Sequence, residues 1–240
     1  MAIKSIIYDN KSFDIAYEIL NPSKKETIVF LHGWGSNKEI MKQGFAKELQ
    51  DFKHIYIDMP GFGKSSNNYT LHTKEYAEIM QVFLDAIKIN TNSSIIAGHS
   101  FGGKIATLLN PKLLVLLSSA GIIEEKSAKT LLTIRMAKIF NKCGLKKVTK
   151  LLRSNDVNMM SENMYETFKN VVDEDFSSTF QKHKGKTILF WGEKDTATTL
   201  KSGMIMHSLI NNSKFYSYYD DHYFFLRHAK DISNKIIKSY

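Results

Sequence analysis

The sequence predicts one α/β domain built around a mostly parallel sheet. Its length of 240 residues suits a single domain of this class. Short apolar runs alternate with longer segments whose apolar residues recur at helical spacing, and this alternation is typical of parallel strands joined by crossover helices. The first two apolar runs are an exception, because only a short turn at Asp9-Asn10-Lys11 separates them, and we expect them to pair antiparallel.

Eight apolar runs are expected to form the strands of this sheet. They are Lys4–Tyr8, Phe13–Leu20, Thr27–Leu31, His54–Asp58, Ser94–Ala97, Leu113–Ser118, Thr187–Phe190 and Lys214–Tyr218. Five segments of helical spacing lie between the later strands or after the last one. They are Lys38–Gln50, Thr73–Ile89, Phe101–Leu109, Thr198–Ile210 and Tyr223–Lys238.

One interval, residues 122–184, interrupts the alternation. It contains no evident strand, and its apolar residues recur at helical spacing in three groups: Leu131, Ile134, Ile139 and Phe140; Val148, Leu151 and Leu152; Met160, Met164 and Phe168. A segment of roughly 60 residues is far too long for a plain loop in a compact domain. We therefore predict a helical cap at 122–184, inserted into a core formed by 1–121 and 185–240.

The composition is that of a globular protein with a basic surface. Hydrophobic residues make up 43% of the chain, which is enough for a sizeable core, and the net charge is +9. Nine basic residues lie between Lys126 and Arg153, a segment without Asp or Glu. Such a run is most often a solvated face of a helix, and the alternative is a docking surface for an acidic partner.

The sequence favours a cytoplasmic protein. No apolar run approaches the roughly 18 residues of a membrane-spanning helix. The first 13 residues are interrupted by charges and do not form a secretory signal, so we expect neither an anchor nor export. The single cysteine, Cys143, cannot form an internal disulfide, and no metal or redox motif surrounds it.

A candidate nucleophile lies in Gly98-His99-Ser100-Phe101-Gly102, which matches the pattern G-x-S-x-G. An apolar run precedes this motif and a helix-like stretch follows it, as in a nucleophile elbow. The turn holds its serine in a strained backbone conformation, and side chains at the two glycine positions would collide with neighbouring backbone. Ser100 is therefore the predicted nucleophile, and a glycine-rich turn with an incidental serine is the alternative.

A second glycine turn, His32-Gly33-Trp34-Gly35, follows the expected strand Thr27–Leu31. With this turn and the elbow, the sequence resembles the α/β-hydrolase family. The resemblance implies an oxyanion hole formed by the backbone N–H groups of Trp34 and Phe101. The segment from Asp58 to Ser65, D-M-P-G-F-G-K-S, is similar to a further motif of that family. We expect Asp58 to bond local backbone and to have no catalytic role.

The resemblance also implies a catalytic acid and a base, in the chain order serine, acid, histidine. Trp191-Gly-Glu-Lys-Asp195 is similar to the family pattern W-G-x-x-D, which places the acid at Asp195, and Glu193 is the rival. His222 lies where the last strand ends and the terminal helix begins, as expected for the base. In one departure from the family pattern, Asp221 stands where relatives often have glycine. We expect this carboxylate to offer the histidine a second partner.

The resemblance implies an enzyme that transfers an acyl group to Ser100 and then hydrolyses it, without a metal or other cofactor. The expected substrate is a small carboxylic ester or thioester. Serine at the elbow excludes the chemistry of related dehalogenases and epoxide hydrolases, which use aspartate there. Carbon–carbon bond hydrolases of meta-cleavage products keep the serine. They usually differ at three positions that are His99, Phe101 and Tyr223 here, which leaves this alternative open but weaker.

A protein partner is also conceivable from the sequence. The H-G-W-G turn resembles that of esterases that cleave the methyl ester of pimeloyl-acyl carrier protein, which also have a short basic cap. An acyl carrier protein is acidic, so the basic run from Lys126 to Arg153 is a candidate surface to attract it.

Non-enzymatic functions are less well supported. Some proteins of this fold are receptors or scaffolds that have lost a triad residue, but here all three candidate positions are filled. No nucleic-acid recognition motif accompanies the basic charge, so we expect no nucleic-acid partner. We expect no membrane partner either, although a basic amphipathic helix in the cap is able to contact anionic lipid.

Overall fold

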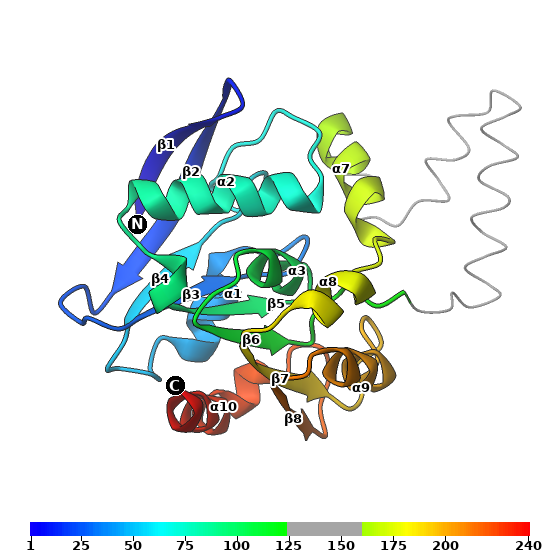
Figure 1. The fold of residues 1–240 in the computed structure, drawn as a ribbon. Coiled ribbons are helices and arrows are strands. Elements are labelled where there is room, and N and C mark those ends of the chain that lie inside the picture. Colours follow the sequence, from blue (N-terminus) through cyan, green and yellow to red (C-terminus); the bar gives the residue numbers. More distant parts are fainter. Residues whose placement is uncertain (124–159) are drawn as a thin grey trace, which may run out of the picture.

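The computed structural model describes residues 1–123 and 160–240, and it contains one eight-stranded sheet covered by helices on both faces (Figure 1). The strands are β1 (Ala2–Tyr8), β2 (Lys11–Leu20), β3 (Thr27–Leu31), β4 (Lys53–Ile57), β5 (Ile95–His99), β6 (Leu113–Leu117), β7 (Lys186–Gly192) and β8 (Ser213–Tyr218). Their order in the sheet is β1-β2-β4-β3-β5-β6-β7-β8. The predicted α/β architecture with eight strands is confirmed.

The sheet is antiparallel only at its N-terminal edge. β1 pairs antiparallel with β2, and β2 pairs antiparallel with β4, whereas the remaining neighbours are parallel. The hairpin turn is tighter than predicted, because Lys11 already pairs with Tyr8. Asp9 and Asn10 form the two-residue loop with φ of 48° and 57°, a conformation that Asp and Asn tolerate better than most residues.

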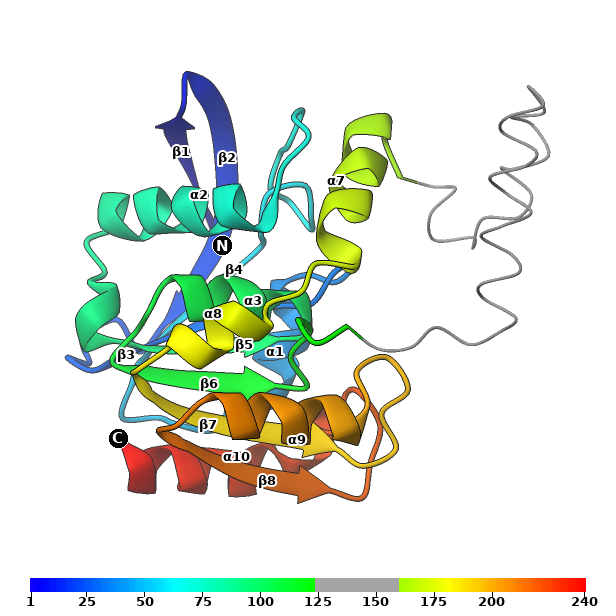
Figure 2. The ribbon, with the colours of Figure 1, turned by 45° about the vertical axis from the view of Figure 1, so that its right-hand side comes forward.

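Seven α-helices and one short 3₁₀ helix are present in the described parts of the chain. The helices are α1 (Lys38–Phe45), α2 (Thr73–Ala86), α3 (Phe101–Leu108), α7 (Glu162–Val172), α8 (Ser177–Lys182), α9 (Leu200–Leu209) and α10 (Phe225–Ser239), with the 3₁₀ helix η1 at Thr91–Ser93. α1 and α10 contribute to the apolar core on one face of the sheet, and α2, α3, α8 and α9 contribute to the core on the other (Figure 2).

The central strands are buried on both faces. Every residue of β3, β5 and β6 is buried. Continuous apolar runs are expected for parallel strands that are covered by helices on both sides, because neither face meets water. The predicted strands and the observed ones therefore agree here to within two residues at each end.

Two predicted helices extend too far at their C-terminal ends. α1 ends at Phe45 instead of Gln50, and α2 ends at Ala86 instead of Ile89. Leu49 and Lys88 have φ of 50° and 60°, which an α-helix cannot accommodate. Apolar spacing alone does not reveal such a reversal of the backbone.

In the predicted cap, the group Met160, Met164 and Phe168 corresponds to α7. The other two groups of apolar residues, and the basic run from Lys126 to Arg153, lie outside the described residues. The limits of the cap therefore stay a prediction. Within residues 1–123 and 160–240, no helix combines the length and apolarity needed to cross a bilayer.

Candidate active site

All predicted site residues lie at one edge of the sheet, where the parallel strands end. The H-G-W-G turn follows β3, Ser100 follows β5, Asp195 follows β7 and His222 follows β8. Loops that follow neighbouring parallel strands meet at the same edge, which is where open α/β sheets bind their ligands. The sheet therefore brings together residues that lie up to about 190 positions apart in the sequence.

Ser100 occupies a strained turn between β5 and α3. Its φ of 51° and ψ of −116° lie outside the conformations that most residues adopt. The flanking glycines make this turn possible. A Cβ on Gly98 would lie 2.3 Å from the carbonyl oxygen of Gly102, and a Cβ on Gly102 would lie 2.5 Å from that of Leu31. The short distance to Leu31 shows that the start of α3 packs directly against the end of β3.

Hydrogen bonds hold the elbow in place. The Ser100 N–H donates to the Leu117 carbonyl at 3.1 Å, and the Ser100 carbonyl accepts from the N–H groups of Gly103 and Ala120 at 3.0 Å each. The backbone of Ser100 is thus fixed by β6 and by the loop after it. The Ser100 side chain is partly exposed, as a nucleophile requires.

Asp195 and His222 form a buried acid–base pair. The His222 Nδ1–H donates to Asp195 Oδ2 at 2.6 Å. The other Asp195 oxygen accepts the N–H groups of Ala197 and Thr198 at 2.8 and 2.9 Å, and the Thr198 hydroxyl donates to Oδ2. Burial opposes ionisation of Asp195, but the hydrogen bond and charge of His222, together with the bonds from Thr198 and Ser118, outweigh it and lower the carboxyl pKa.

This bond also decides which nitrogen of His222 is available. Because Nδ1 carries the hydrogen that Asp195 accepts, Nε2 is left with a lone pair. Glu193, the rival acid, is exposed and instead accepts a hydrogen bond from Ser217 on β8 at 2.7 Å. The structure therefore brings Asp195, and not Glu193, to the histidine.

His99 connects the elbow to the histidine loop. Its buried ring lies 4.5 Å from the His222 ring, centroid to centroid, and its Nε2–H donates to the His222 carbonyl at 3.1 Å. Burial lowers the pKa of His99 to about 3, so the ring is neutral at physiological pH. In the described part of the chain, no hydrogen bond joins the Ser100 hydroxyl directly to His222.

The H-G-W-G turn packs directly against the elbow. A Cβ on Gly33 would lie 3.1 Å from the Cβ of Ser100, so only glycine fits there without displacement. The rings of Trp34 and Phe101 are 5.5 Å apart. Neither residue's backbone N–H donates to a backbone carbonyl within residues 1–123 and 160–240, so both are available to an oxyanion.

Hydrogen bonds of the buried side chains of His32 and Asp58 hold this turn in place. His32 donates from Nδ1 to the Gly33 carbonyl at 2.7 Å and accepts the Met59 N–H on Nε2 at 3.0 Å. Burial lowers the pKa of His32 to about 4. Asp58 accepts the backbone N–H and the ammonium group of Lys38 at 2.7 and 2.9 Å. The expected local role of Asp58 agrees with these bonds.

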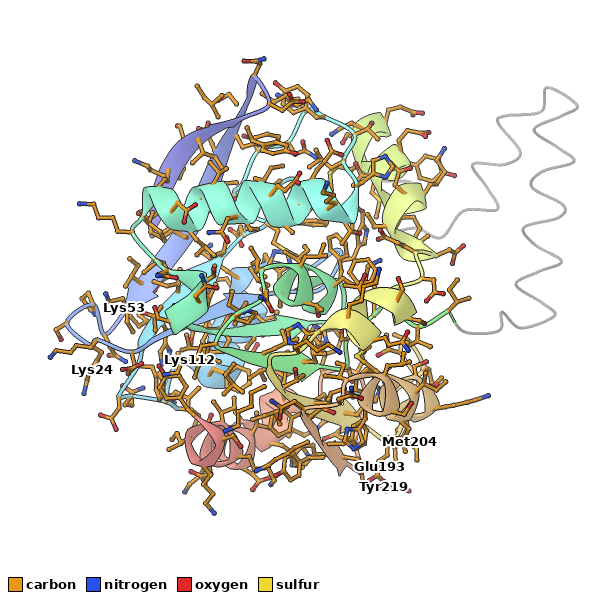
Figure 3. All side chains as sticks on the ribbon, viewed as in Figure 1. Lys24, Lys53, Lys112, Glu193, Met204 and Tyr219 are labelled. Atoms are coloured by element: carbon orange, nitrogen blue, oxygen red, sulfur yellow. The ribbon has the colours of Figure 1, made fainter. Side chains whose placement is uncertain are left out.

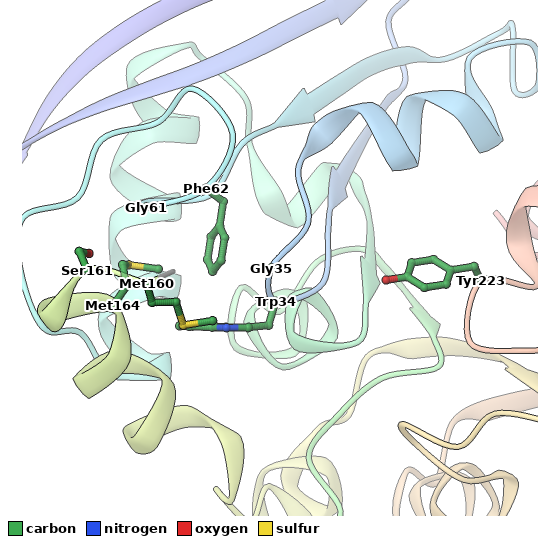
Figure 4. Close-up of a pocket in the computed structure, with 8 residues that line it drawn as sticks. All are labelled: Trp34, Gly35, Gly61, Phe62, Met160, Ser161, Met164 and Tyr223. Atoms are coloured by element: carbon green, nitrogen blue, oxygen red, sulfur yellow. The ribbon is translucent and has the colours of Figure 1, made fainter. Parts of the chain in front are cut away.

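A pocket of about 620 Å³ opens beside the turn (Figure 4). Its lining residues are Trp34, Gly35, Gly61, Phe62, Met160, Ser161, Met164 and Tyr223. Met164 lies in the first turn of α7 and Met160 lies two residues before this helix, and Figure 4 shows Tyr223 entering from the opposite side. Because Tyr223 follows His222 directly and Trp34 belongs to the turn, the pocket adjoins the residues described above. Its aromatic and thioether walls suit an apolar group.

Asp221 does not bond the imidazole of His222. Its Oδ1 accepts the Tyr223 N–H at 2.8 Å, and its Oδ2 pairs with Arg227 at 3.0 Å. The side chain is more than half exposed. The carboxylate that replaces the usual glycine therefore organises the histidine loop from its outer side, through the first turn of α10.

Sequence reasoning missed the contribution of His99, Lys38 and Arg227. His99 had been noted only as a position within the elbow motif, although a histidine next to the nucleophile is a chemical signal in itself. Lys38 and Arg227 are ordinary basic residues in the sequence. Their partners, Asp58 and the acidic pair before His222, lie close to them only after folding.

Comparison with known proteins agrees with this arrangement. The family model for the alpha/beta hydrolase fold matches residues 26–112. The pimeloyl-[acyl-carrier protein] methyl ester esterase of Pseudoalteromonas atlantica is 35% identical over 99 residues, which are 38% of this chain and 36% of that protein. An uncharacterized hydrolase of Bacillus subtilis is 25% identical over 85% of both chains. An esterase structure from Exiguobacterium antarcticum superposes with a TM-score of 0.73 at 19% identity, over 94% of this chain and 95% of that one.

The chain has the α/β-hydrolase fold, and residues 26–112 match the family model of that fold. The matched region contains the H-G-W-G turn, the D-x-P-G-x-G-x-S segment and the elbow. Matches at 30% identity or more span only about a third of the length of those curated relatives.

Proposed function

We propose that the protein is a serine hydrolase that cleaves a carboxylic ester or thioester through an acyl-enzyme on Ser100. The observation that carries this proposal is the Asp195–His222 hydrogen bond of 2.6 Å beside the strained elbow that presents Ser100. A buried carboxylate that fixes the tautomer of a histidine, next to a serine held in a costly conformation, is the arrangement that activates a hydroxyl nucleophile.

In the proposed reaction, His222 Nε2 takes the Ser100 proton as Oγ attacks the substrate carbonyl carbon. The N–H groups of Trp34 and Phe101 stabilise the resulting oxyanion, and α3 directs its N-terminus at the same point. The tetrahedral species then collapses. The bond to the alcohol or thiol breaks, and the leaving group takes the proton from His222. A water molecule, deprotonated by the same nitrogen, hydrolyses the acyl-enzyme.

The pocket beside Trp34 is the proposed site for the acyl chain. Its volume of about 620 Å³ and its walls of Trp34, Phe62, Met160 and Met164 favour a chain of medium length over acetate. The likeness to proteins named as esterases supports an ester as the substrate.

The test is hydrolysis of p-nitrophenyl esters from acetate to dodecanoate by the wild type and by Ser100→Ala. We expect turnover that is highest for medium chains and falls at least about 10⁴-fold in the variant. A fluorophosphonate probe should label the wild type and not Ser100→Ala. Absence of both turnover and labelling would refute the proposal in favour of a non-catalytic binding protein. Labelling without ester turnover would point to carbon–carbon bond cleavage instead.

A carrier-bound acyl group is a second candidate substrate. Two observations favour it: the likeness to an esterase named for a pimeloyl-acyl carrier protein substrate, and the nine basic residues between Lys126 and Arg153. Reversal of four charges in this run, Lys126→Glu, Lys129→Glu, Lys146→Glu and Lys147→Glu together, should lower kcat/KM on an acyl carrier protein ester by about tenfold or more. Hydrolysis of p-nitrophenyl butyrate should stay unchanged. If the charge-reversed variant kept the wild-type kcat/KM on both substrates, this candidate would be excluded.

A further inference from the structure

Lys104 is a buried lysine that the proposed mechanism does not use. It is the fourth residue of α3, the helix that begins directly after Ser100, and it is only 1% exposed. Its ammonium group donates to the Val171 carbonyl at 2.8 Å and pairs with Glu174 Oε2 at 2.8 Å. Both partners belong to the C-terminal end of α7 and the residues just after it.

Burial lowers the pKa of Lys104, and the groups around its ammonium offset part of this cost of burying a cation. The carbonyls at the end of a helix carry partial negative charge, so Val171 is a suitable partner for a cation. The ring of Phe176 lies 4.8 Å from the ammonium group. The Thr73 hydroxyl of α2 donates to the same oxygen of Glu174. The Lys104–Glu174 pair therefore joins α2, α3 and the end of α7.

α7 has a second attachment near its other end. Asn163 donates to the Asn67 carbonyl at 3.0 Å, and Thr167 accepts the Leu71 N–H at 3.0 Å. These bonds hold the first two turns of α7 to the segment 67–71, and Asn170 adds a longer bond of 3.3 Å to the Leu71 carbonyl. Figures 1 and 2 show α7 near the edge of the sheet at which the parallel strands β5 and β6 end.

Met164 lies within the attachment to the segment 67–71, and Phe168 lies between that attachment and the bonds of Lys104. Met164 lines the pocket, and a Cβ on Gly61 would lie 2.4 Å from its sulfur, so the two residues fit closely. One turn further on, the ring of Phe168 lies 5.4 Å from that of Trp34. Release of the C-terminal attachment would allow α7 to pivot about the segment 67–71, which would separate Phe168 from Trp34 and widen the pocket.

We propose that Lys104 is a positioning residue that, through Val171 and Glu174, holds α7 against the acyl pocket and so sets the selectivity between long and short acyl chains. This inference rests on the proposed function for its kinetic consequence. Lys104 acts through α7 and does not touch the substrate. Long chains need the wall formed by Met164 and by the Trp34 ring against which Phe168 packs, whereas acetate does not reach this wall.

The kinetic test compares Lys104→Met with the wild type on p-nitrophenyl decanoate and acetate. We expect kcat/KM on decanoate to fall about tenfold, through KM, while acetate hydrolysis stays within about twofold. Glu174→Gln should show a smaller loss in the same direction, because the bond to Val171 remains. The matched control is Lys74→Met on α2, whose side chain is 80% exposed; it should behave as the wild type.

A second readout does not depend on catalysis. The chain has two tryptophans. Trp191 is fully buried, whereas Trp34 packs against Phe168. Acrylamide should therefore quench the fluorescence of Lys104→Met about twofold more strongly than that of the wild type, and Trp34→Phe in the same background should abolish the difference. Because this measurement needs no substrate, it remains informative if ester hydrolysis itself is not found.

Three outcomes would overturn the inference. The first is an equal proportional loss on decanoate and acetate, which would indicate a general effect on the elbow. The second is unchanged selectivity together with unchanged quenching in a folded Lys104→Met protein. If Lys104→Met does not fold, Glu174→Gln carries the test, and unchanged selectivity and quenching in that variant would be the third.

Discussion

Asp195 illustrates how much of the site depends on single side chains. Its two oxygens accept from two backbone N–H groups, the Thr198 hydroxyl and His222, so the carboxylate has no freedom to rotate. The loop after β7 thereby presents one oxygen to the histidine and uses the other to hold its own shape. A neutral amide at this position offers two donors where the site needs acceptors.

We therefore expect Asp195→Asn to lower kcat by about 10³–10⁴-fold with little change in KM, because the amide would favour the wrong tautomer of His222. Steady-state kinetics on a p-nitrophenyl ester measures this loss. Glu193→Gln is the matched control, since Glu193 is exposed and bonds only Ser217 among the described residues. A loss of activity in Glu193→Gln that equals the loss in Asp195→Asn would contradict the assignment of the acid.

Two glycines of the site, Gly98 in the elbow and Gly35 in the H-G-W-G turn, exclude a side chain for different reasons. At Gly98 the added Cβ would meet backbone atoms of Gly102 and Gly103 between 2.3 and 2.6 Å away. At Gly35 the φ of +71° disfavours a side chain, but nothing lies within 4 Å of the position that a Cβ would take. The first position is crowded, and the second is only strained.

From this contrast, Gly98→Ala should lower the free energy of unfolding by more than about 4 kcal/mol, whereas Gly35→Ala should lower it by about 1 kcal/mol. Urea unfolding followed by circular dichroism measures both values. Similar losses in the two variants would show that strain, and not collision with backbone, dominates at the elbow.

In the described part of the molecule, burial lowers the pKa of four histidines, His32, His54, His99 and His183. Burial lowers the pKa of His32 to about 4 and that of His99 to about 3, while an unfolded chain has a histidine pKa of about 6.5. Below pH 6.5 the unfolded chain therefore binds protons that the folded chain does not bind. The stability that both residues contribute is complete above pH 6.5 and is lost as the pH falls towards 4.

His32 and His99 should each add about 1.4 kcal/mol per pH unit to the fall in the free energy of unfolding between roughly pH 6 and pH 4.5. Urea unfolding at several pH values in this range measures how steeply the free energy of unfolding changes with pH. This slope should be smaller in His32→Asn than in the wild type by about 1.4 kcal/mol per pH unit. A change in the absolute stability of the variant does not affect this test, because only the pH dependence of the free energy of unfolding is compared. An unchanged slope would mean that His32 is already protonated in the folded protein.

The strands and the motif positions were predictable from the sequence, because they depend on local patterns. β3, β5 and β6 are uninterrupted apolar runs, and burial on both faces makes such runs visible. The glycines around Ser100 predict the turn, because a tight strand-to-helix connection requires them. Helix ends such as those at Phe45 and Ala86 were less predictable, because a positive φ at one residue leaves no periodic signal.

The amino-acid sequence by itself determined the sheet, the elbow and the loops from which Ser100, Asp195 and His222 come. Only the tertiary structure decided which groups meet: Asp195 and not Glu193 at the histidine, Arg227 at Asp221, and Lys104 at the end of α7. Strands and turns follow from interactions between residues near in sequence. Hydrogen bonds and ion pairs depend on distances of a few ångströms between loops far apart in the chain, and folding alone sets those distances.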